Sequence, residues 1–143
     1  MGLRLIDHNS PEYRQMVNLR YNILRQPLGL TFSDEDLALE KDDILLASFE
    51  DDDMLACCIL SQTPEHATLR LRQMAVPKNM QGKGIGAALL VFAENIARDK
   101  GYKRITMNAR NTAIGFYERA GYKIYGNDFI EVGLPHHTME KYI

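Results

Sequence analysis

The chain has 143 residues, 45% of them hydrophobic and 25% charged, proportions typical of one soluble domain that buries its own core. Its 17 basic and 19 acidic side chains leave a net charge of −2, which excludes a broad basic surface for nucleic acid or anionic lipid. No stretch approaches the roughly 20 apolar residues of a membrane span, and the first residues show no signal-peptide pattern. We therefore expect a single cytoplasmic domain over residues 1–143.

The first half of the chain is predicted to hold two short helices among four strands. Ser10 stands before a proline and a glutamate, which marks a helix start, and Ser33 caps a second helix in the same way. The predicted elements begin with a strand at 3–6 and a helix that starts at residue 11 and is ended by Pro27 and Gly29. A second helix within 31–40 follows, and then strands at 44–50, 54–62 and 68–76. The acidic residues 51–53 form the hairpin turn between the first two of these strands.

Cys57 and Cys58 are neighbours inside the strand at 54–62. Adjacent strand residues point to opposite faces, so a disulfide between them would be strained. We expect two small buried side chains, and the spacing gives no sign of a metal or redox centre.

In the second half, apolar residues recur at helical spacing at Ile85, Leu89, Phe92 and Ile96, which predicts a helix within 84–100. A strand at 104–109, a helix at 112–120 and strands at 122–125 and 136–142 follow. The order β-α-α-β-β-β-α-β-α-β-β predicts an α/β fold of the α+β type, with a mixed sheet and helices on its faces. Its one crossover should be right-handed, and should make the strands at 68–76 and 104–109 parallel.

Three alternating glycines lie between the strand at 68–76 and the next helix, in Gln81-Gly-Lys-Gly-Ile-Gly86. Such a loop lets backbone approach a ligand, and the helix behind it offers unpaired N–H groups and a partial positive charge, which suits a phosphate. A P-loop is excluded because Gly84, not Ser or Thr, follows Lys83. A dinucleotide fingerprint fits poorly, because no acid ends the next strand at 107–109. Coenzyme A and a connector without a ligand remain as alternatives.

The flanking segments carry a family resemblance. Residues 74–86 (MAVPKNMQGKGIG) resemble motif A of the GNAT acyltransferases, whose core is [QR]-x-x-G-x-[GA], and residues 111–122 (NTAIGFYERAGY) resemble their motif B, which ends F-Y-x-x-x-G-[FY]. The motifs lie one helix and one strand apart, as in the family. The resemblance implies the GNAT fold and an acetyl-CoA-dependent N-acetyltransferase. It would act on a small-molecule or peptide primary amine in a ternary complex, without a covalent intermediate. A non-catalytic acyl-CoA-binding module is the alternative, and homodimerisation stays open.

The resemblance also implies roles for the matching positions. Backbone of Met74, Ala75 and Val76 would bind the pantetheine arm where the parallel strands part, just after Val76. Amides of the loop would bind the diphosphate, from Gln81, Gly82, Lys83, Gly84, Ile85, Gly86 and Ala87. Asn111 would steady the pantetheine and Phe116 would pack along the cofactor. The amide of Met74 or a neighbour would stabilise the oxyanion.

Tyr117 matches the family's usual general acid, which would protonate the departing thiolate; the alternative is a core tyrosine with a bonded hydroxyl. The strand at 69–76 lacks the glutamate that many of these enzymes use as general base. His136 is the favoured replacement because an imidazole titrates near working pH, with a purely structural histidine as the alternative. His137 would point the opposite way, and Glu131 is a weaker candidate.

Charged residues leave the acceptor open. Arg70 and Arg72 share one side of a regular strand and would either attract an acidic group of the acceptor or form a solvated face. The acidic stretch 34–40 would instead favour a cationic substrate if it bordered the entrance. Residues 129–139 resemble a small bacterial branch of the family whose last strands read E-x-G-[IL]-P-H-x-x-M.

Overall fold

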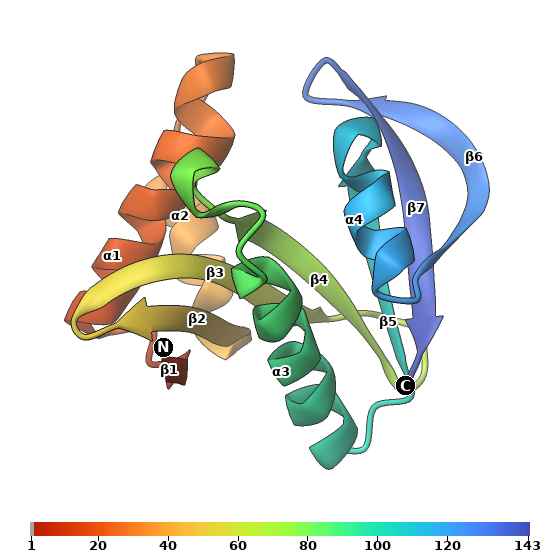
Figure 1. Cartoon of the computed structure of the whole chain (residues 1–143), viewed down its shortest axis with the longest axis horizontal. Helices are drawn as coiled ribbons and strands as arrows, with labels where there is room; N and C mark the ends of the chain where they lie inside the picture. The colour runs from red at the N-terminus through yellow and green to blue at the C-terminus, as the bar shows by residue number, and fades with distance from the viewer. Residues whose placement is uncertain (1) are drawn as a thin grey trace.

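The computed structural model describes residues 2–143, which form a seven-stranded mixed sheet with helices on both faces (Figure 1). The strands are β1 (Gly2–Ile6), β2 (Ile44–Glu50), β3 (Asp53–Gln62), β4 (Thr68–Ala75), β5 (Arg104–Arg110), β6 (Lys123–Glu131) and β7 (Leu134–Tyr142). Their spatial order is β1-β2-β3-β4-β5-β7-β6, and all neighbours are antiparallel except β4 and β5. The predicted order of elements and the predicted parallel pair are confirmed.

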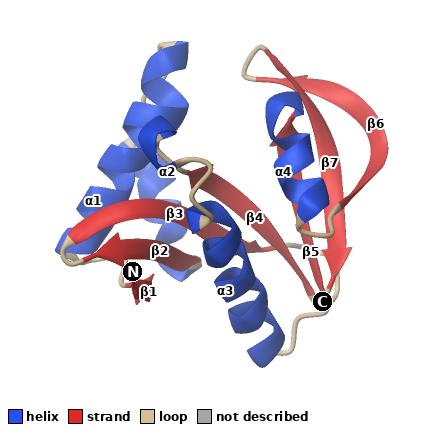
Figure 2. Cartoon of the chain, in the orientation of Figure 1, coloured by secondary structure: helices blue, strands red, loops and turns tan. Residues whose placement is uncertain are grey.

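The helices, drawn in blue in Figure 2, are α1 (Pro11–Arg20), α2 (Asp34–Ala38), α3 (Ile85–Asp99) and α4 (Ile114–Arg119). Ser10 and Ser33 cap α1 and α2 as predicted, each accepting a hydrogen bond from a backbone amide. After α1 the helical path continues through π and 3₁₀ turns over residues 21–28 and stops at Gly29, where φ is +69°. Pro27 therefore lies inside the last turn and does not end the helix. Within residues 2–143, no helix has the length and apolar character needed to cross a bilayer.

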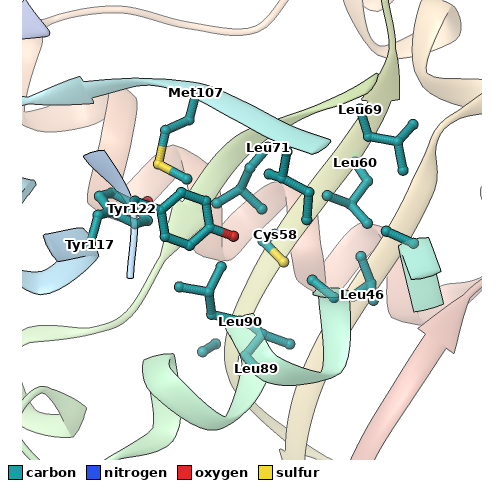
Figure 3. Packing of buried hydrophobic residues seen from close by; sticks show 14 of the residues in the cluster. Leu46, Cys58, Leu60, Leu69, Leu71, Leu89, Leu90, Met107, Tyr117 and Tyr122 are labelled. Carbon is teal, nitrogen blue, oxygen red and sulfur yellow. The ribbon is translucent and has the colours of Figure 1, made fainter. Parts of the chain in front are cut away.

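Two apolar clusters, one on each face of the sheet, hold the helices in place. On one face α3 and α4 pack over the strands, and the fully buried Leu89 and Leu90 share a cluster with Tyr117 and Tyr122 (Figure 3). On the other face α1 packs through Met16 against β2 and β3. α1 thus buries its apolar side chains against one side of the sheet, and α3 and α4 bury theirs against the other.

The adjacent cysteines show the alternation of β3. Cys57 belongs to the cluster under α1 and Cys58 to the cluster under α3, and both are fully buried free thiols. Burial raises the pKa of Cys57 to about 12 and the pKa of Cys58 well above its ordinary value. The prediction of two small buried side chains is confirmed.

The parallel strands β4 and β5 pair over a short stretch only, residues 68–70 with residues 104–106. Beyond Arg70 they diverge, and Figure 1 shows the resulting V. The prediction that these strands part is confirmed, but the predicted point, just after Val76, was wrong because the separation begins right after Arg70. β4 itself continues to Ala75 by pairing with β3 alone.

A β-bulge gives a physical reason for the early separation. Gln73 and Met74 of β4 stand opposite a single residue of β3, Cys58, and Gln73 has a φ of +56°. A bulge bends its strand and increases the local twist, so β4 turns away from β5 instead of following it. The bulge also takes backbone groups of β4 out of the regular ladder at the mouth of the V.

The outermost strand is longer than predicted. β6 runs to Glu131 instead of ending at residue 125, with an irregularity between Tyr125 and Phe129. As the exposed edge of the sheet it lacks the apolar alternation that marks a half-buried strand. Its extension pairs with the start of β7 and brings Glu131 close to His136.

Candidate active site

A cavity of about 1030 Å³ occupies the gap between the diverging strands β4 and β5. Besides these strands, four parts of the chain line it: the glycine loop with the start of α3, the helix α4, the connection between α1 and α2, and the β6–β7 hairpin. Because α3 and α4 lie on one face of the sheet and α1 on the other, a ligand in this cavity would have access to both faces.

The glycine loop brings an uncapped helix start to the cavity. Gly84 precedes α3 in the left-handed conformation with a φ of +80°, and no side chain of the described part of the protein caps the helix. The first amides of α3 therefore lack acceptors and carry the positive end of the helix dipole. A Cβ at Gly84 would meet nothing within 4 Å, so the space beside it is open. This arrangement fits a diphosphate group.

Gly86 lets α3 approach α4 closely. A Cβ at this buried glycine would lie 3.2 Å from Cζ of Phe116 and 3.4 Å from Cγ2 of Val76. The side chain of Gln81 donates a hydrogen bond of 3.0 Å to the carbonyl of Val76, which ties the loop to the end of β4. The predicted loop, the end of β4 and the predicted aromatic residue therefore form one continuous wall of the cavity.

Tyr117 on α4 lines the cavity with only 7% of its surface exposed. Its ring packs edge-on against Tyr122, with centroids 5.9 Å apart. The hydroxyl of Tyr122 donates to Glu94 at 2.9 Å, whereas the hydroxyl of Tyr117 has no hydrogen-bond partner among residues 2–143. The oxygen itself keeps some solvent contact at the cavity wall, so it is available to a ligand there. Burial also raises the pKa of Tyr117, so it keeps its proton throughout the neutral range.

His136 on β7 lies in the cavity wall and is 3% exposed. Its Nδ1 is 2.8 Å from the carbonyl oxygen of Leu134, and its ring stacks on Phe129 with centroids 5.7 Å apart. Donation from Nδ1 to that carbonyl leaves Nε2 able to accept a proton, and Nε2 lies 3.6 Å from Oε2 of Glu131. The favoured candidate for the base, His136, and the weaker candidate, Glu131, are thus brought together, whereas His137 does not line the cavity.

Most of the predicted cofactor residues line the cavity: Met74, Val76, Gln81, Gly82, Gly84, Ile85, Gly86, Ala87 and Phe116. Ala75, Lys83 and Asn111 do not. Ala75 is fully buried in the cluster under α1, and Lys83 is exposed to solvent. Asn111 is exposed, and its Oδ1 lies 2.7 Å from Nδ1 of His137. The neighbouring Arg110 lines the cavity in its place.

The charge around the cavity is the opposite of what an acidic entrance would give. No residue of the stretch 34–40 is part of the lining, and Glu40 is instead buried, with its Oε2 2.7 Å from Nη2 of Arg20. Burial alone would raise the pKa of Glu40, but hydrogen bonds from Arg20 and Tyr13 outweigh it and hold that pKa below its ordinary value. Both Arg70 and Arg72 do line the cavity.

Sequence reasoning missed part of the wall. Ile23, Leu24 and Leu30, from the turns between α1 and α2, also line the cavity. In the sequence these apolar residues look like ordinary core residues of a helix. Only contacts with distant parts of the chain bring them to the cavity. Arg110 adds such a contact, with its Nη2 3.5 Å from the carbonyl oxygen of Leu24.

In comparisons with known proteins, residues 32–143 match the family described as "Acetyltransferase (GNAT) domain". A protein named "Probable N-acetyltransferase 14" from Xenopus tropicalis is 30% identical over 129 residues, which are 88% of this chain and 54% of that protein. The chain spans about half the length of the curated relatives it matches.

Solved structures of low sequence identity share the fold. An aminoglycoside 6'-N-acetyltransferase complexed with coenzyme A has a TM-score of 0.82 at 17% identity, covering 99% of this chain and 97% of that one. A Bacillus subtilis acetyltransferase in complex with CoA has a TM-score of 0.73 at 18% identity, covering 99% and 97%. The fold predicted from the two motifs is confirmed.

Proposed function

This chain belongs to the acetyltransferase (GNAT) domain family, a family of acyltransferases that use acetyl-CoA, and from that premise we propose that it transfers an acetyl group from acetyl-CoA to a primary amine. The observation that carries the proposal is the V between β4 and β5, with its cavity and the uncapped start of α3 at its edge. We propose direct attack by the amine in a ternary complex. The buried cysteines, with raised pKa values, do not line the cavity and offer no nucleophile.

The open backbone of the V would hold the cofactor. The amides of Ile85, Gly86 and Ala87, with the positive end of α3 behind them, would bind its diphosphate. Along residues 71–76, the side of β4 that has left β5 offers peptide groups to the amides of pantetheine. Bound acetyl-CoA would supply the acetyl thioester. The backbone amide of Met74, at the bulge, is our candidate donor for the oxyanion.

Two side chains would move protons. Tyr117 holds its proton because burial raises its pKa, and Oη would deliver that proton to the departing thiolate. His136, whose Nδ1 is held by the carbonyl of Leu134, would accept the proton of the attacking amine at Nε2, with Glu131 close enough to stabilise the resulting imidazolium. This assignment replaces the carboxylate that the strand β4 lacks.

The C-terminal segment supports a finer assignment to the bacterial branch with the G-[IL]-P-H-x-x-M pattern. In this chain the pattern spans the β6–β7 turn, where Gly133 has a φ of +76° and Pro135 is the second residue of the strand that carries His136. The pattern thus builds the hairpin that presents the candidate base. We also propose a cytoplasmic location, which two free thiols favour.

The test is release of coenzyme A thiol from acetyl-CoA in the presence of a panel of amines, together with the melting temperature with and without acetyl-CoA. We expect a raised melting temperature and amine-dependent thiol release. Cofactor binding without turnover on any amine would indicate the non-catalytic module instead. No shift at millimolar acetyl-CoA would contradict both functions.

A further inference from the structure

The face of the sheet opposite α3 carries the polar half of the cavity. Along β4, Leu69 and Leu71 pack in the cluster under α3, so the alternating residues Arg70 and Arg72 lie on the other face. The side chain of Arg72 confirms this, since its Nη1 lies 3.8 Å from Asp43 and it helps to line a second pocket, together with Arg20. Both β4 arginines therefore face away from the glycine loop.

β5 and β7 extend the same face across the V. Ile105, Met107 and Ala109 pack in the cluster under α3, which places Arg110 on the opposite face. Arg110 is the register partner of His136, so their side chains leave the sheet next to each other. The candidate base thus stands beside an arginine, on the face that also carries the arginines of β4.

The charge of the lining is strongly one-sided. Glu131 is the one carboxylate among the described residues that line the cavity, against five arginines: Arg25, Arg70, Arg72, Arg110 and Arg119. Nε of Arg70 is buried and has no hydrogen-bond partner within residues 2–143. A buried donor of a charged group without an acceptor is costly, and a bound oxyanion would satisfy it.

The diphosphate of the cofactor does not account for the arginines of β4. The amides suited to that group lie at the start of α3, on the face away from Arg70 and Arg72. The base candidate His136 lies on the arginine side, and the amine must come to the base. An anion held by these arginines therefore belongs to the acceptor.

We propose that the acceptor is a small primary amine that also carries a carboxylate or a phosphate, and that Arg70 and Arg72 bind this group while the amine reaches His136. The proposal rests on the acetyltransferase function proposed above and names the substrate class of the same site. The planar guanidinium group can donate two parallel hydrogen bonds to either a carboxylate or a phosphate. Arg110 and Arg25 add positive potential at the same end of the cavity.

Matched pairs of amines test the proposal at saturating acetyl-CoA. β-Alanine is compared with its amide, and O-phosphoethanolamine with ethanolamine, so each pair differs in the anionic group. Hydrogen bonds to a charged group are worth about 1.5–3 kcal/mol, so we expect kcat/KM to be roughly 10- to 100-fold higher for the anionic member of at least one pair. The pair that shows the preference distinguishes carboxylate from phosphate.

The variants Arg70→Met and Arg72→Met keep most of the apolar stem and remove the charge. Each should reduce kcat/KM for the preferred anionic amine by roughly 10- to 100-fold and for its neutral counterpart by much less, so that the preference within the pair is lost, while the KM for acetyl-CoA changes by less than about twofold. Arg14→Met, on an exposed position of α1, is the matched control and should behave as wild type. If Arg72→Met does not fold, the comparison of the amine pairs with the wild-type enzyme and with Arg70→Met still tests the proposal.

Three results would overturn the proposal: equal kcat/KM within both pairs, neutral amines preferred over their anionic counterparts, or an increase in the KM for acetyl-CoA as the main effect of the arginine variants. The last would assign the arginines to the cofactor. These results differ from a failure of the proposed acetyltransferase function. In that case thiol release would be absent with all four amines, whatever their charge.

Discussion

Replacing Tyr117 by phenylalanine separates the chemical role of its hydroxyl from its packing. The ring is buried against Tyr122 and keeps its contacts in the variant, and the deleted hydroxyl leaves no protein group without a partner. We therefore expect the free energy of unfolding to change by less than about 1 kcal/mol. A positioned general acid contributes about 10²- to 10⁴-fold, so kcat should decrease by at least about 100-fold. The Kd of acetyl-CoA should change by less than about threefold.

The matched control is Tyr122→Phe, which deletes the same atom from the neighbouring ring. Here the hydroxyl donates to Glu94 at 2.9 Å, and its loss leaves a buried carboxylate with one donor fewer. This variant should lose about 1–3 kcal/mol of stability and keep the kcat of the folded enzyme. Thiol-release kinetics and urea denaturation of both variants measure the two quantities. A Tyr117→Phe enzyme with wild-type kcat, or one whose loss of activity follows its loss of stability, would rule out Tyr117 as the general acid.

Three further predictions concern the loop, the base and the buried ion pair. Gly84→Val should abolish the rise in melting temperature caused by acetyl-CoA, because it fills open space at the start of α3 and forces a branched residue to a φ of +80°; normal binding would show that the loop is only a connector. His136→Gln should lower kcat/KM near neutral pH, with the deficit shrinking as pH rises and the acceptor amine loses its own proton; a pH-independent deficit would contradict a base role. Arg20→Met should cost about 3–5 kcal/mol at pH 7, because it removes the positive charge that compensates the buried Glu40 and leaves the Tyr13 hydroxyl as its donor. The pKa of Glu40 is lowered in the folded protein, so the ion pair stabilises the fold fully above the unfolded pKa of about 4.3 and progressively less as pH falls below it. Urea denaturation of the wild type and Arg20→Met should therefore show a smaller difference in the free energy of unfolding at pH 4 than at pH 7. An equal difference at both pH values would contradict this prediction.

The parts of the fold that local chemistry determines could be predicted from the sequence. Ser10 and Ser33 mark helix starts, and the glycines of the loop mark the turn before α3. The spacing of Ile85, Leu89, Phe92 and Ile96 predicts the helix α3, in which Ile85 and Leu89 are buried while Phe92 and Ile96 lie partly buried at the edge of the packed face. The same residues led to the cofactor loop. Each depends on hydrogen bonds or periodicity within a few residues, so the signal is visible in the chain itself.

The remaining features depend on contacts between distant segments. Gln73 adopts a positive φ without being glycine or asparagine, so the bulge that opens the V has no composition signal. β6 continues past Tyr125 through exposed residues because β7 pairs with it, not because its sequence alternates. The acidic stretch 34–40 suggested a cationic substrate, but Glu40 forms a buried ion pair with Arg20 inside the protein.

We propose that backbone freed by the parting of β4 from β5, together with the start of α3, holds acetyl-CoA. Hydrogen–deuterium exchange of the wild-type protein with and without coenzyme A measures this backbone directly. We expect protection on binding in two segments, residues 71–76 and residues 84–87, and little change in β1 and β2. Coenzyme A binding that leaves the exchange of both segments unchanged would contradict this mode of cofactor binding.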